Sequence, residues 1–390
     1  MMDALIPIGL LAAALWSARR RRPVMVGATL LAVTPMAWFM FAVVNPSGVT
    51  IAGGVAVLVG GIGVWRSATT RSRDRWLVAV GWAALVLPRR DGLIWAALIA
   101  SVLLLLAAPD PDALLRRLGR RPLLAVAAST VAVLVWAWRS ETNTSQALFV
   151  APLVVVAAYG VSRVWPRLAA LPAAARVGVA SGAAAGGLAA MYVVMAQRSA
   201  GFDGVALRLT IGNTGNDLTE AVGVLGWLDT PVPTSAVFAV FAAVGALVAL
   251  VILVGDVRPL VGVVMVVAAA VAASWTLSML QNNDVGSYWQ GRYYLPLLAG
   301  APLLAASVEL ERAAARRVGV ALAGVALEVA NIALAATMRR FGVGIAGSLN
   351  PLEWDTYGAP LTPLVLLVLH IAASVGLGAV LFRGHADVTH

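Results

Sequence analysis

The chain has 390 residues, of which 61% are hydrophobic and only 12% are charged, and its mean hydropathy is +0.89. Soluble domains carry about 45–50% apolar and about 25% charged residues, so this composition excludes an ordinary soluble protein. Long apolar runs separated by short charged turns indicate a multi-pass membrane protein. We therefore predict an all-α fold, a polytopic helical bundle that forms one transmembrane domain over residues 1–390.

All 28 basic residues are arginines, and the formal net charge is +10. The arginines gather in short loops between apolar runs, where membrane topology and lipid headgroups explain them better than nucleic acid does. Membrane lipids are therefore the expected partners, and nucleic acid is not. The exclusive use of arginine, with abundant alanine, valine and glycine, suggests a GC-rich bacterial genome and hence the bacterial plasma membrane.

The sequence contains no cysteine and three histidines, His370, His385 and His390. One histidine lies in an apolar run and two lie in the tail, so a histidine-bound metal is not expected. No phosphate-cradling loop, dinucleotide fingerprint, Ser–His–Asp arrangement or metalloprotease motif occurs. A resident cofactor and an enzyme that uses a soluble nucleotide are therefore not expected.

In chain order, the apolar runs predict about 13 transmembrane helices, within a range of about 11 to 14 because some runs are short for a span. These runs cover residues 1–16, 24–44, 49–65, 76–87, 93–108, 122–138, 147–165, 177–196, 235–254, 260–280, 294–307, 318–338 and 361–382. The arginine-rich loops place the N-terminus outside and the tail inside. The first run is short enough to be the end of a longer helix in a fuller protein.

The polar connections all fall on the outer side of this topology, at residues 45–48, 89–92, 197–234, 281–292 and 339–360. They collect carboxylates, amides and aromatic residues, which suit sugars, and arginines, which suit a phosphate. Arg89 and Arg90 lie there against the positive-inside trend. Either the hairpin at 76–108 is re-entrant, or these two arginines face a phosphate on the outer side.

A polar and aromatic island at residues 281–296 separates two long apolar runs. An interfacial loop is one interpretation, because aromatic residues anchor at this depth. The segment Gln290-Gly-Arg-Tyr293 favours a binding site, because Gly291 would let an anionic headgroup or sugar approach the backbone beside the five-donor fork of Arg292. Both interpretations stay open at this stage.

Further carboxylates are candidates for chemistry. Asp229 can act as a base or orient a hydroxyl, although a capped interfacial turn explains it as well. Asp217 and Glu220 are three residues apart and can share a helical face. Glu328 lies midway along an apolar run, with Asn331 on the same face, and is either a proton or ion site or a structural helix–helix hydrogen bond.

Five motifs follow one another in the sequence: Thr34-Pro35, Asn45-Pro-Ser-Gly48, Arg89-Arg-Asp-Gly-Leu-Ile-Trp95, Gly226-Trp-Leu-Asp-Thr230, and Gln290-Gly-Arg-Tyr293 with Pro296. This ordered set resembles the bacterial predicted-membrane-protein family called domain of unknown function twenty-one forty-two. That family is similar to the GT-C type of membrane glycosyltransferases, which use polyprenyl-phosphate sugars at the outer face.

The resemblance implies roles for individual residues. Arg292, with Arg89 and Arg90, would hold the phosphate of a polyprenyl-phosphate-linked sugar. The sugar site would be lined by Gln290, Gly291, Trp227, Tyr293 and Asn45. Asp229 would be the catalytic carboxylate.

One departure from the family pattern bears on activity. Members begin with an extra span and an outer loop that carries an acidic Pro-Asp-Glu type motif, where GT-C enzymes hold their catalytic carboxylate. Here apolar sequence begins directly after Asp3, and no such motif precedes Asn45. Either the true start lies upstream, the protein is a degenerate relative, or another carboxylate has taken over.

Three functions therefore remain. The leading one is a GT-C-like membrane protein, a glycosyltransferase in its active form, that handles polyprenyl-phosphate-linked sugars for cell-envelope polysaccharide. The second is a transporter or flippase for envelope lipids or polysaccharide, to which Glu328 and the short spans would be relevant. The third is a non-catalytic membrane partner.

Overall fold

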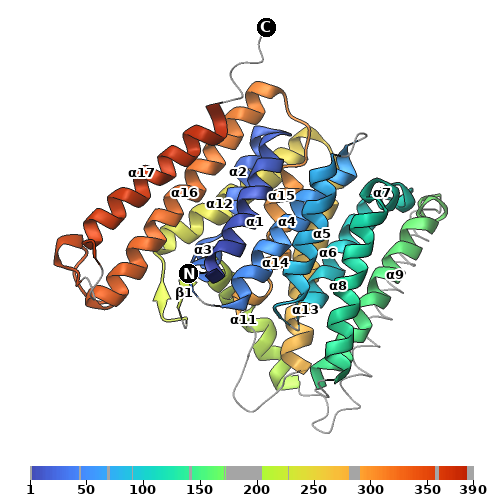
Figure 1. Ribbon diagram of the computed structural model, residues 1–390, viewed down its shortest axis with the longest axis horizontal. Coiled ribbons are helices and arrows are strands. Elements are labelled where there is room, and N and C mark those ends of the chain that lie inside the picture. The colour runs from blue at the N-terminus through green and yellow to red at the C-terminus, as the bar shows by residue number, and fades with distance from the viewer. Residues whose placement is uncertain are drawn as a thin grey trace.

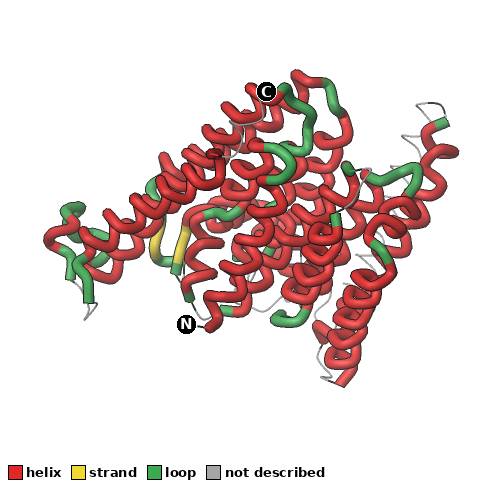
Figure 2. The backbone as a smooth tube through the Cα atoms, turned by 45° about the horizontal axis from the view of Figure 1, so that its top comes forward, coloured by secondary structure: helices red, strands yellow, loops and turns green. Residues whose placement is uncertain are grey.

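The computed structural model describes residues 2–43, 45–67, 71–89, 91–139, 143–170, 172, 204–226, 228–280, 290–355 and 360–383. Within these ranges the protein is a bundle of α-helices with one two-stranded hairpin (Figures 1 and 2). The predicted all-α membrane bundle is confirmed.

The α-helices are α1 (Met2–Arg19), α2 (Pro23–Ala32), α3 (Pro35–Ala42), α4 (Pro46–Arg66), α5 (Ser72–Val86), α6 (Gly92–Leu106), α7 (Pro111–Leu118), α8 (Arg120–Arg139), α9 (Asn143–Ala169), α11 (Gly204–Gly223), α12 (Thr234–Val254), α13 (Val257–Leu280), α14 (Leu295–Leu298), α15 (Gly300–Ala305), α16 (Arg312–Val343) and α17 (Pro363–Arg383). Two 3-10 helices, η1 (Gly291–Tyr293) and η2 (Pro351–Glu353), and two strands, β1 (Val224–Leu225) and β2 (Thr230–Pro231), complete the fold.

Six of the described helices are long and apolar enough to cross a membrane, namely α4, α8, α12, α13, α16 and α17. The number rises to eight if the bent pairs α2–α3 and α6–α7 each count as one span. This supports a multi-pass membrane protein and leaves the predicted count of about 13 as a prediction. The predicted run at 177–196 lies outside the described residues.

The run predicted as one span at 24–44 is bent by 68° between α2 and α3. The bend falls at Thr34-Pro35. Proline starts α3 because it needs no intrahelical N–H partner at that position, and the Thr34 hydroxyl accepts a hydrogen bond from the Ala37 N–H at 3.3 Å. The same hydroxyl donates to the Ala221 carbonyl at 2.8 Å, which ties the bend to α11.

Helix α4 forms the centre of the bundle (Figure 1). Of the apolar stretch of α4, 94% is buried inside the protein, whereas only 11% of the apolar stretch of α17 is buried. Glycine allows the close contact of α4 with α5, because a Cβ atom at Gly53 would lie 2.6 Å from the Leu85 nitrogen. The apolar side chains that the outer helices expose suit contact with lipid.

One end of the bundle, which we call the Arg292 end, gathers the polar connections that the sequence placed on one side. Three contacts join their described parts: Arg89 with Ser47 at 2.8 Å, Arg292 with the Gly226 carbonyl at 3.5 Å, and Arg340 with Asp229 at 2.8 Å. Residues as far as 111 positions apart in the sequence therefore meet at this end.

The opposite end, which we call the Arg117 end, joins the arginine-rich connections to one another. Its contacts include Arg66 with Asp256 at 2.8 Å, Arg22 with Glu309 at 3.2 Å, and Arg117 with the Trp65 carbonyl at 3.0 Å. The bundle thus separates the two classes of connection in the way that the predicted topology requires.

A buried ion pair joins three helices near the Arg117 end. Asp74 on α5 has a side chain only 4% exposed, and it accepts hydrogen bonds from Ser17 of α1 at 2.5 Å and from Arg21 at 2.9 Å. Arg21 also donates to the Val59 carbonyl of α4 at 2.7 Å. Because each group of this cluster has a partner, we interpret it as a structural connection between α1, α4 and α5.

Candidate anion site at the Arg292 end

The short helix η1 positions the site by packing directly on α11. The Gly291 N–H donates to the Glu220 carboxylate at 3.2 Å. A Cβ atom at Gly291 would lie 2.0 Å from the Asp217 carbonyl oxygen, so only glycine fits this contact. What approaches the Gly291 backbone is therefore helix α11, and the ligand groups of the site must come from the residues that flank it.

Arg292 is held only loosely by the neighbours that the structure describes. Its two terminal nitrogens lie 3.5 Å from the Gly226 carbonyl and 3.5 Å from the Tyr293 hydroxyl, which are long distances for hydrogen bonds. Its Nε is buried and has no hydrogen-bond partner among the described residues, and the same holds for Oε1 of Gln290. Arg292 forms no ion pair with a described residue, so no carboxylate in the described part of the chain balances its positive charge.

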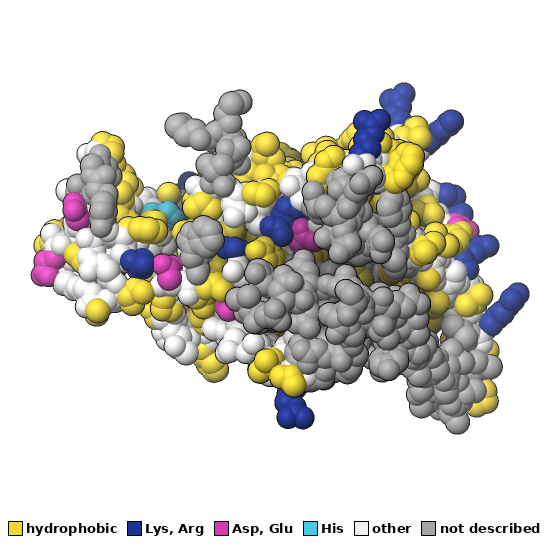
Figure 3. Space-filling view, turned by 90° about the horizontal axis from the view of Figure 1, so that it is seen from below, with side chains coloured by type: hydrophobic (Ala, Val, Ile, Leu, Met, Phe, Trp, Pro, Cys, Tyr) yellow, Lys and Arg dark blue, Asp and Glu magenta, His cyan; other side chains and the backbone are white. Residues whose placement is uncertain are grey.

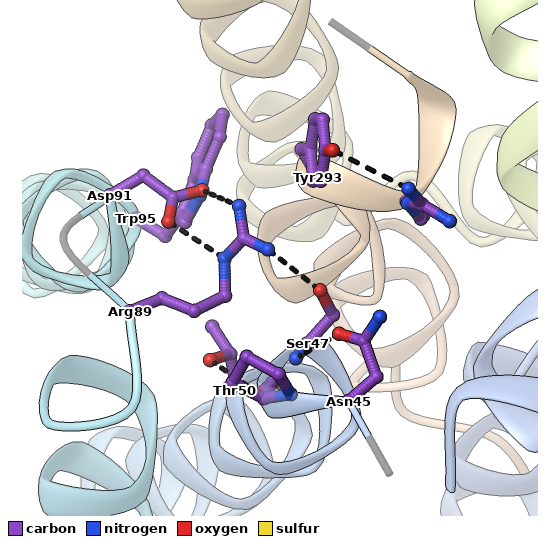
Figure 4. A network of polar contacts seen from close by, with 9 residues as sticks. Asn45, Ser47, Thr50, Arg89, Asp91, Trp95 and Tyr293 are labelled. Carbon is purple, nitrogen blue, oxygen red and sulfur yellow. Dashed lines mark hydrogen bonds and ion pairs between the residues drawn. The ribbon is translucent and has the colours of Figure 1, made fainter. Parts of the chain in front are cut away.

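Arg89 is held firmly in comparison (Figure 4). Its Nε lies 2.8 Å from one oxygen of Asp91, and a terminal nitrogen lies 3.2 Å from the other oxygen. The remaining terminal nitrogen donates to the Ser47 hydroxyl at 2.8 Å, and Asp91 also accepts from the Trp95 indole at 3.1 Å. The charge of Arg89 is therefore balanced by a carboxylate with a side chain only 9% exposed.

The ring of Tyr293 connects the two arginines. Its centroid lies 4.6 Å from the guanidinium carbon of Arg89 and 5.3 Å from that of Arg292. Both distances fall within the range of cation–π contacts. Tyr293 thus contacts two guanidinium groups, of which Arg89 is paired with a carboxylate and Arg292 has no ion-pair partner within the described ranges.

Asn45 contributes by shaping the start of α4. Its side chain caps the helix by accepting a hydrogen bond from the Ser47 N–H at 2.8 Å. The cap fixes Ser47, whose hydroxyl then accepts from Arg89 (Figure 4). Asn45 therefore supports the site through Ser47 and Arg89.

Two carboxylates on α11 lie next to η1. Asp217 is 6% exposed and has no hydrogen-bond partner among the residues that the structure describes. Burial, together with the nearby charge of Glu220, raises the pKa of Asp217 to about 6 from the usual 3.8. Helix α11 is not among the six helices apolar enough to span a membrane. The three-residue spacing in the sequence was the one signal for this pair.

Asp229 lies in the turn between β1 and β2, where Gly226 and Leu228 both adopt positive φ angles of 68° and 65°. Its carboxylate pairs with Arg340 of α16 at 2.8 Å and accepts from the Thr230 hydroxyl at 3.1 Å. Asp229 is thus part of the link between the hairpin and α16.

The surface of this end mixes the two kinds of charge. The hairpin and α11 lie toward the lower side of Figure 1, and Figure 3 views the molecule from that side. Acidic and basic side chains appear there between hydrophobic ones. Such a surface offers both donors and acceptors to a ligand at the end of an apolar bundle.

The family described as "Predicted membrane protein (DUF2142)" matches residues 1–301. The chain belongs to this family. No curated protein and no solved structure matches it. The predicted resemblance is therefore confirmed at the level of the family, and the DUF2142 region contains every site residue described above except Arg340.

Two predicted site residues of the DUF2142 region, Arg90 and Trp227, lie outside the described residues, as do residues 281–289 of the polar island. The structure brings together Asn45, Arg89, Gln290, Gly291, Arg292 and Tyr293, and it places Asp229 beside Arg340. It adds residues that the sequence did not single out for the site, namely Ser47, Asp91, Trp95 and Arg340.

Glu328 lies on α16, away from these residues. It is exposed, and it forms no hydrogen bond or ion pair with a described residue. Asn331 instead accepts a hydrogen bond from Ser374 at 3.2 Å, and its Oδ1 lies 2.6 Å from Nδ1 of His370 on α17. The polar contact between α16 and α17 therefore centres on Asn331.

Proposed function

We propose that this DUF2142 protein is a GT-C-like membrane protein of the bacterial plasma membrane that binds a polyprenyl-phosphate-linked sugar at the Arg292 end during assembly of cell-envelope polysaccharide. The observation that carries the proposal is the state of Arg292. Its Nε is buried without a partner, and no described carboxylate pairs with it. A buried donor of this kind is costly unless a ligand satisfies it.

An anionic ligand fits the charges at this end. Arg89 is already neutralised by Asp91, so Arg292 supplies the spare positive charge. A guanidinium can hold phosphate oxygens through two parallel hydrogen bonds. We therefore assign phosphate binding to Arg292, and we assign to Arg89 the task of holding Tyr293 and Ser47 beside it.

A lipid-linked sugar fits the surroundings. The site lies where the apolar helix α14 begins, so the phosphate would lie at the membrane boundary while its lipid stays among apolar side chains. Sugar hydroxyls need acceptors, and Oε1 of Gln290 and the Glu220 carboxylate provide them. The Tyr293 ring offers an apolar face against which a sugar can pack.

Sugar transfer would need a carboxylate that takes the proton of an acceptor hydroxyl. Asp229 remains a candidate, and its pairing with Arg340 would have to open during the reaction. Glu220 requires no such opening, because within the described residues its carboxylate accepts a hydrogen bond only from the Gly291 N–H. We therefore add Glu220 to Asp229 as a candidate base.

The test is binding of a polyprenyl-phosphate analogue to purified protein in detergent. Hydrogen bonds to charged groups contribute about 1.5–3 kcal/mol, so Arg292→Ala should weaken binding about tenfold or more. Arg292→Lys should be nearly as damaging, because lysine supplies a point charge and not a planar fork.

Two controls complete the experiment. Glu328→Gln should bind as the wild type does, because Glu328 is far along α16 from the Arg292 end. Arg116→Lys should also leave binding unchanged, because Arg116 is an exposed arginine on α7. A folded Arg292→Lys variant that binds like the wild type would show that Arg292 only anchors the loop at the interface.

A further inference from the structure

A cavity of 370 Å³ lies between helices α4, α5, α6, α7, α8 and α9. Its wall is apolar, with Val57, Leu93, Leu104, Leu118 and Val155 among the lining residues. The one hydroxyl in the wall, that of Thr130, already accepts from the Trp82 indole and donates to the Val126 carbonyl. Cavities without free polar groups do not hold water well and favour hydrocarbon.

Much of the cavity wall lies toward the Arg117 end, and Leu93 at the start of α6 extends it toward the candidate anion site. Helix α4 begins at the Arg292 end, and the residues that it gives to the cavity, Val57, Gly61 and Val64, come from its second half. Helix α7 contributes Leu114, Leu115 and Leu118, and it is fixed at the Arg117 end by the bond from Arg117 to the Trp65 carbonyl. The cavity and the candidate anion site therefore share no residue, although Leu93 brings the cavity wall to within two residues of Asp91.

Arginines surround this end of the cavity. Helix α7 is amphipathic, with leucines at the cavity and Arg116 and Arg117 on its other positions. Exposed Arg120 and Arg121 follow at the start of α8, and Leu123 lines the cavity one turn or less further along. Apolar space and positive charge are thus separated by about one helical turn, or 5.4 Å.

The charges of Arg120 and Arg121 are not balanced within the described chain. The nearby acids have partners already, since Asp110 pairs with Arg116 at 3.1 Å and Asp112 pairs with Arg163 at 2.5 Å. Neither Arg120 nor Arg121 forms an ion pair with a described residue. A ligand with an apolar tail and an anionic head would satisfy both parts of this arrangement.

We propose that the cavity holds one acyl chain of an anionic phospholipid from the adjacent leaflet, with its phosphate at Arg120 and Arg121. At about 30 Å³ for each small group, the volume of 370 Å³ has room for roughly 12 methylene groups, which is most of an acyl chain. This site does not rest on the proposed function, because it shares no residue with the Arg292 end.

The first experiment measures lipid binding by native mass spectrometry on the full chain in detergent. The probes are phosphatidylglycerol and phosphatidylcholine with identical acyl chains, so that only the head charge differs. The wild type should retain one phosphatidylglycerol per chain, about tenfold more tightly than phosphatidylcholine. Equal retention of the two lipids would overturn the assignment of an anionic head.

The second experiment fills the cavity. Ala100 lines the wall, so Ala100→Phe should reduce phosphatidylglycerol binding by at least about tenfold. Ala127→Phe on the exposed face of α8 is the matched control and should bind as the wild type does. Unchanged binding in Ala100→Phe would overturn the proposal. The proposal would also be overturned if Ala100→Phe lost binding of the polyprenyl-phosphate analogue but kept phosphatidylglycerol. That result would mean that the cavity holds the prenyl chain.

The third experiment removes the two arginine charges that are proposed to bind the lipid headgroup. The double variant Arg120→Gln, Arg121→Gln should bind phosphatidylglycerol no better than phosphatidylcholine, and Arg383→Gln at the end of α17 should not change the preference. An unchanged preference in the double variant would overturn the headgroup assignment. If Ala100→Phe does not fold, Ala100→Leu and this double variant provide the same test, with melting temperatures compared in lipid-free detergent.

Discussion

Arg89 and Arg292 lie against the same tyrosine ring but differ in what holds them. Arg89 is followed two residues later by Asp91, which is close enough in sequence for a bidentate ion pair at the start of α6. Arg292 follows Gly291 in the 3-10 helix η1, and among the described residues its guanidinium reaches only the Gly226 carbonyl and the Tyr293 hydroxyl. Substitution of Arg89 should therefore affect folding first, whereas substitution of Arg292 should affect binding first.

Asp217 should make the stability of the protein depend on pH. Its folded-state pKa of about 6 lies above the unfolded value of 3.8, so the folded state binds the proton more tightly. This contribution is fully present below pH 3.8 and is lost as the pH rises through about 6. Asp217→Asn should therefore melt like the wild type near pH 4 and at a higher temperature near pH 7.5, by up to about 3 kcal/mol in free energy of unfolding.

The measurement is the melting temperature of both proteins in detergent across this range of pH. Asp110→Asn is the control, since Asp110 is an exposed acid paired with Arg116 on the surface, and its pH profile should follow that of the wild type. Parallel profiles for wild type and Asp217→Asn would contradict the prediction.

At the scale of helices, α16 depends on glycine where it crosses α2. A Cβ atom at Gly319 would lie 2.3 Å from the Pro23 carbonyl oxygen, and one at Gly27 would lie 2.3 Å from the Gly319 oxygen. The two backbones therefore touch, as small residues permit in membrane bundles. Gly324, one and a half turns further along α16, has open space around its Cβ position.

These two glycines give a matched prediction. Gly319→Ala should lower the free energy of unfolding by about 1–3 kcal/mol, because the helices must move apart. Gly324→Ala should be neutral or stabilising by about 0.5–1 kcal/mol, because alanine favours a helix more than glycine does. Thermal unfolding in detergent measures both. A Gly319→Ala variant as stable as Gly324→Ala would mean that α2 and α16 are not in backbone contact.

For the whole molecule, the separation of the two ends predicts a topology. Asn45 and Gly212 belong to the Arg292 end and should face the outside, whereas Arg73, Arg117 and Arg316 should face the cytoplasm. The chain contains no cysteine, so single cysteines at these positions can be labelled without a competing thiol. The predicted outer position Gly286 lies outside the described residues and can be included in the same series.

An impermeant maleimide should label positions 45 and 212 in intact cells, and positions 73, 117 and 316 only after permeabilisation. Labelling of positions 45 and 73 under the same condition would contradict the assignment of the two ends. The result would also decide from which leaflet the proposed phospholipid enters, because much of the cavity wall lies toward the Arg117 end.

The sequence alone determined the class of this protein and its family. The apolar runs predicted most of the long helices. A membrane span must be apolar along its length and must form its backbone hydrogen bonds within the helix. The run predicted at 235–254 became α12 (Thr234–Val254), and that at 361–382 became α17 (Pro363–Arg383). The positions of the arginines separated the two ends, and the ordered motifs identified DUF2142.

Only the tertiary structure decided which polar groups become partners. Sequence spacing pairs Glu328 with Asn331, but Asn331 contacts His370 and Ser374 of α17. The sequence named Asp229 as the catalytic carboxylate and linked Glu220 only to Asp217, but Asp229 pairs with Arg340, 111 residues away, and Glu220 binds the Gly291 N–H, 71 residues away. Helical periodicity reports which face a residue occupies and not which helix packs against that face. The cavity was hidden from the sequence for the same reason, since its wall is built from six helices whose apolar residues look alike along the chain.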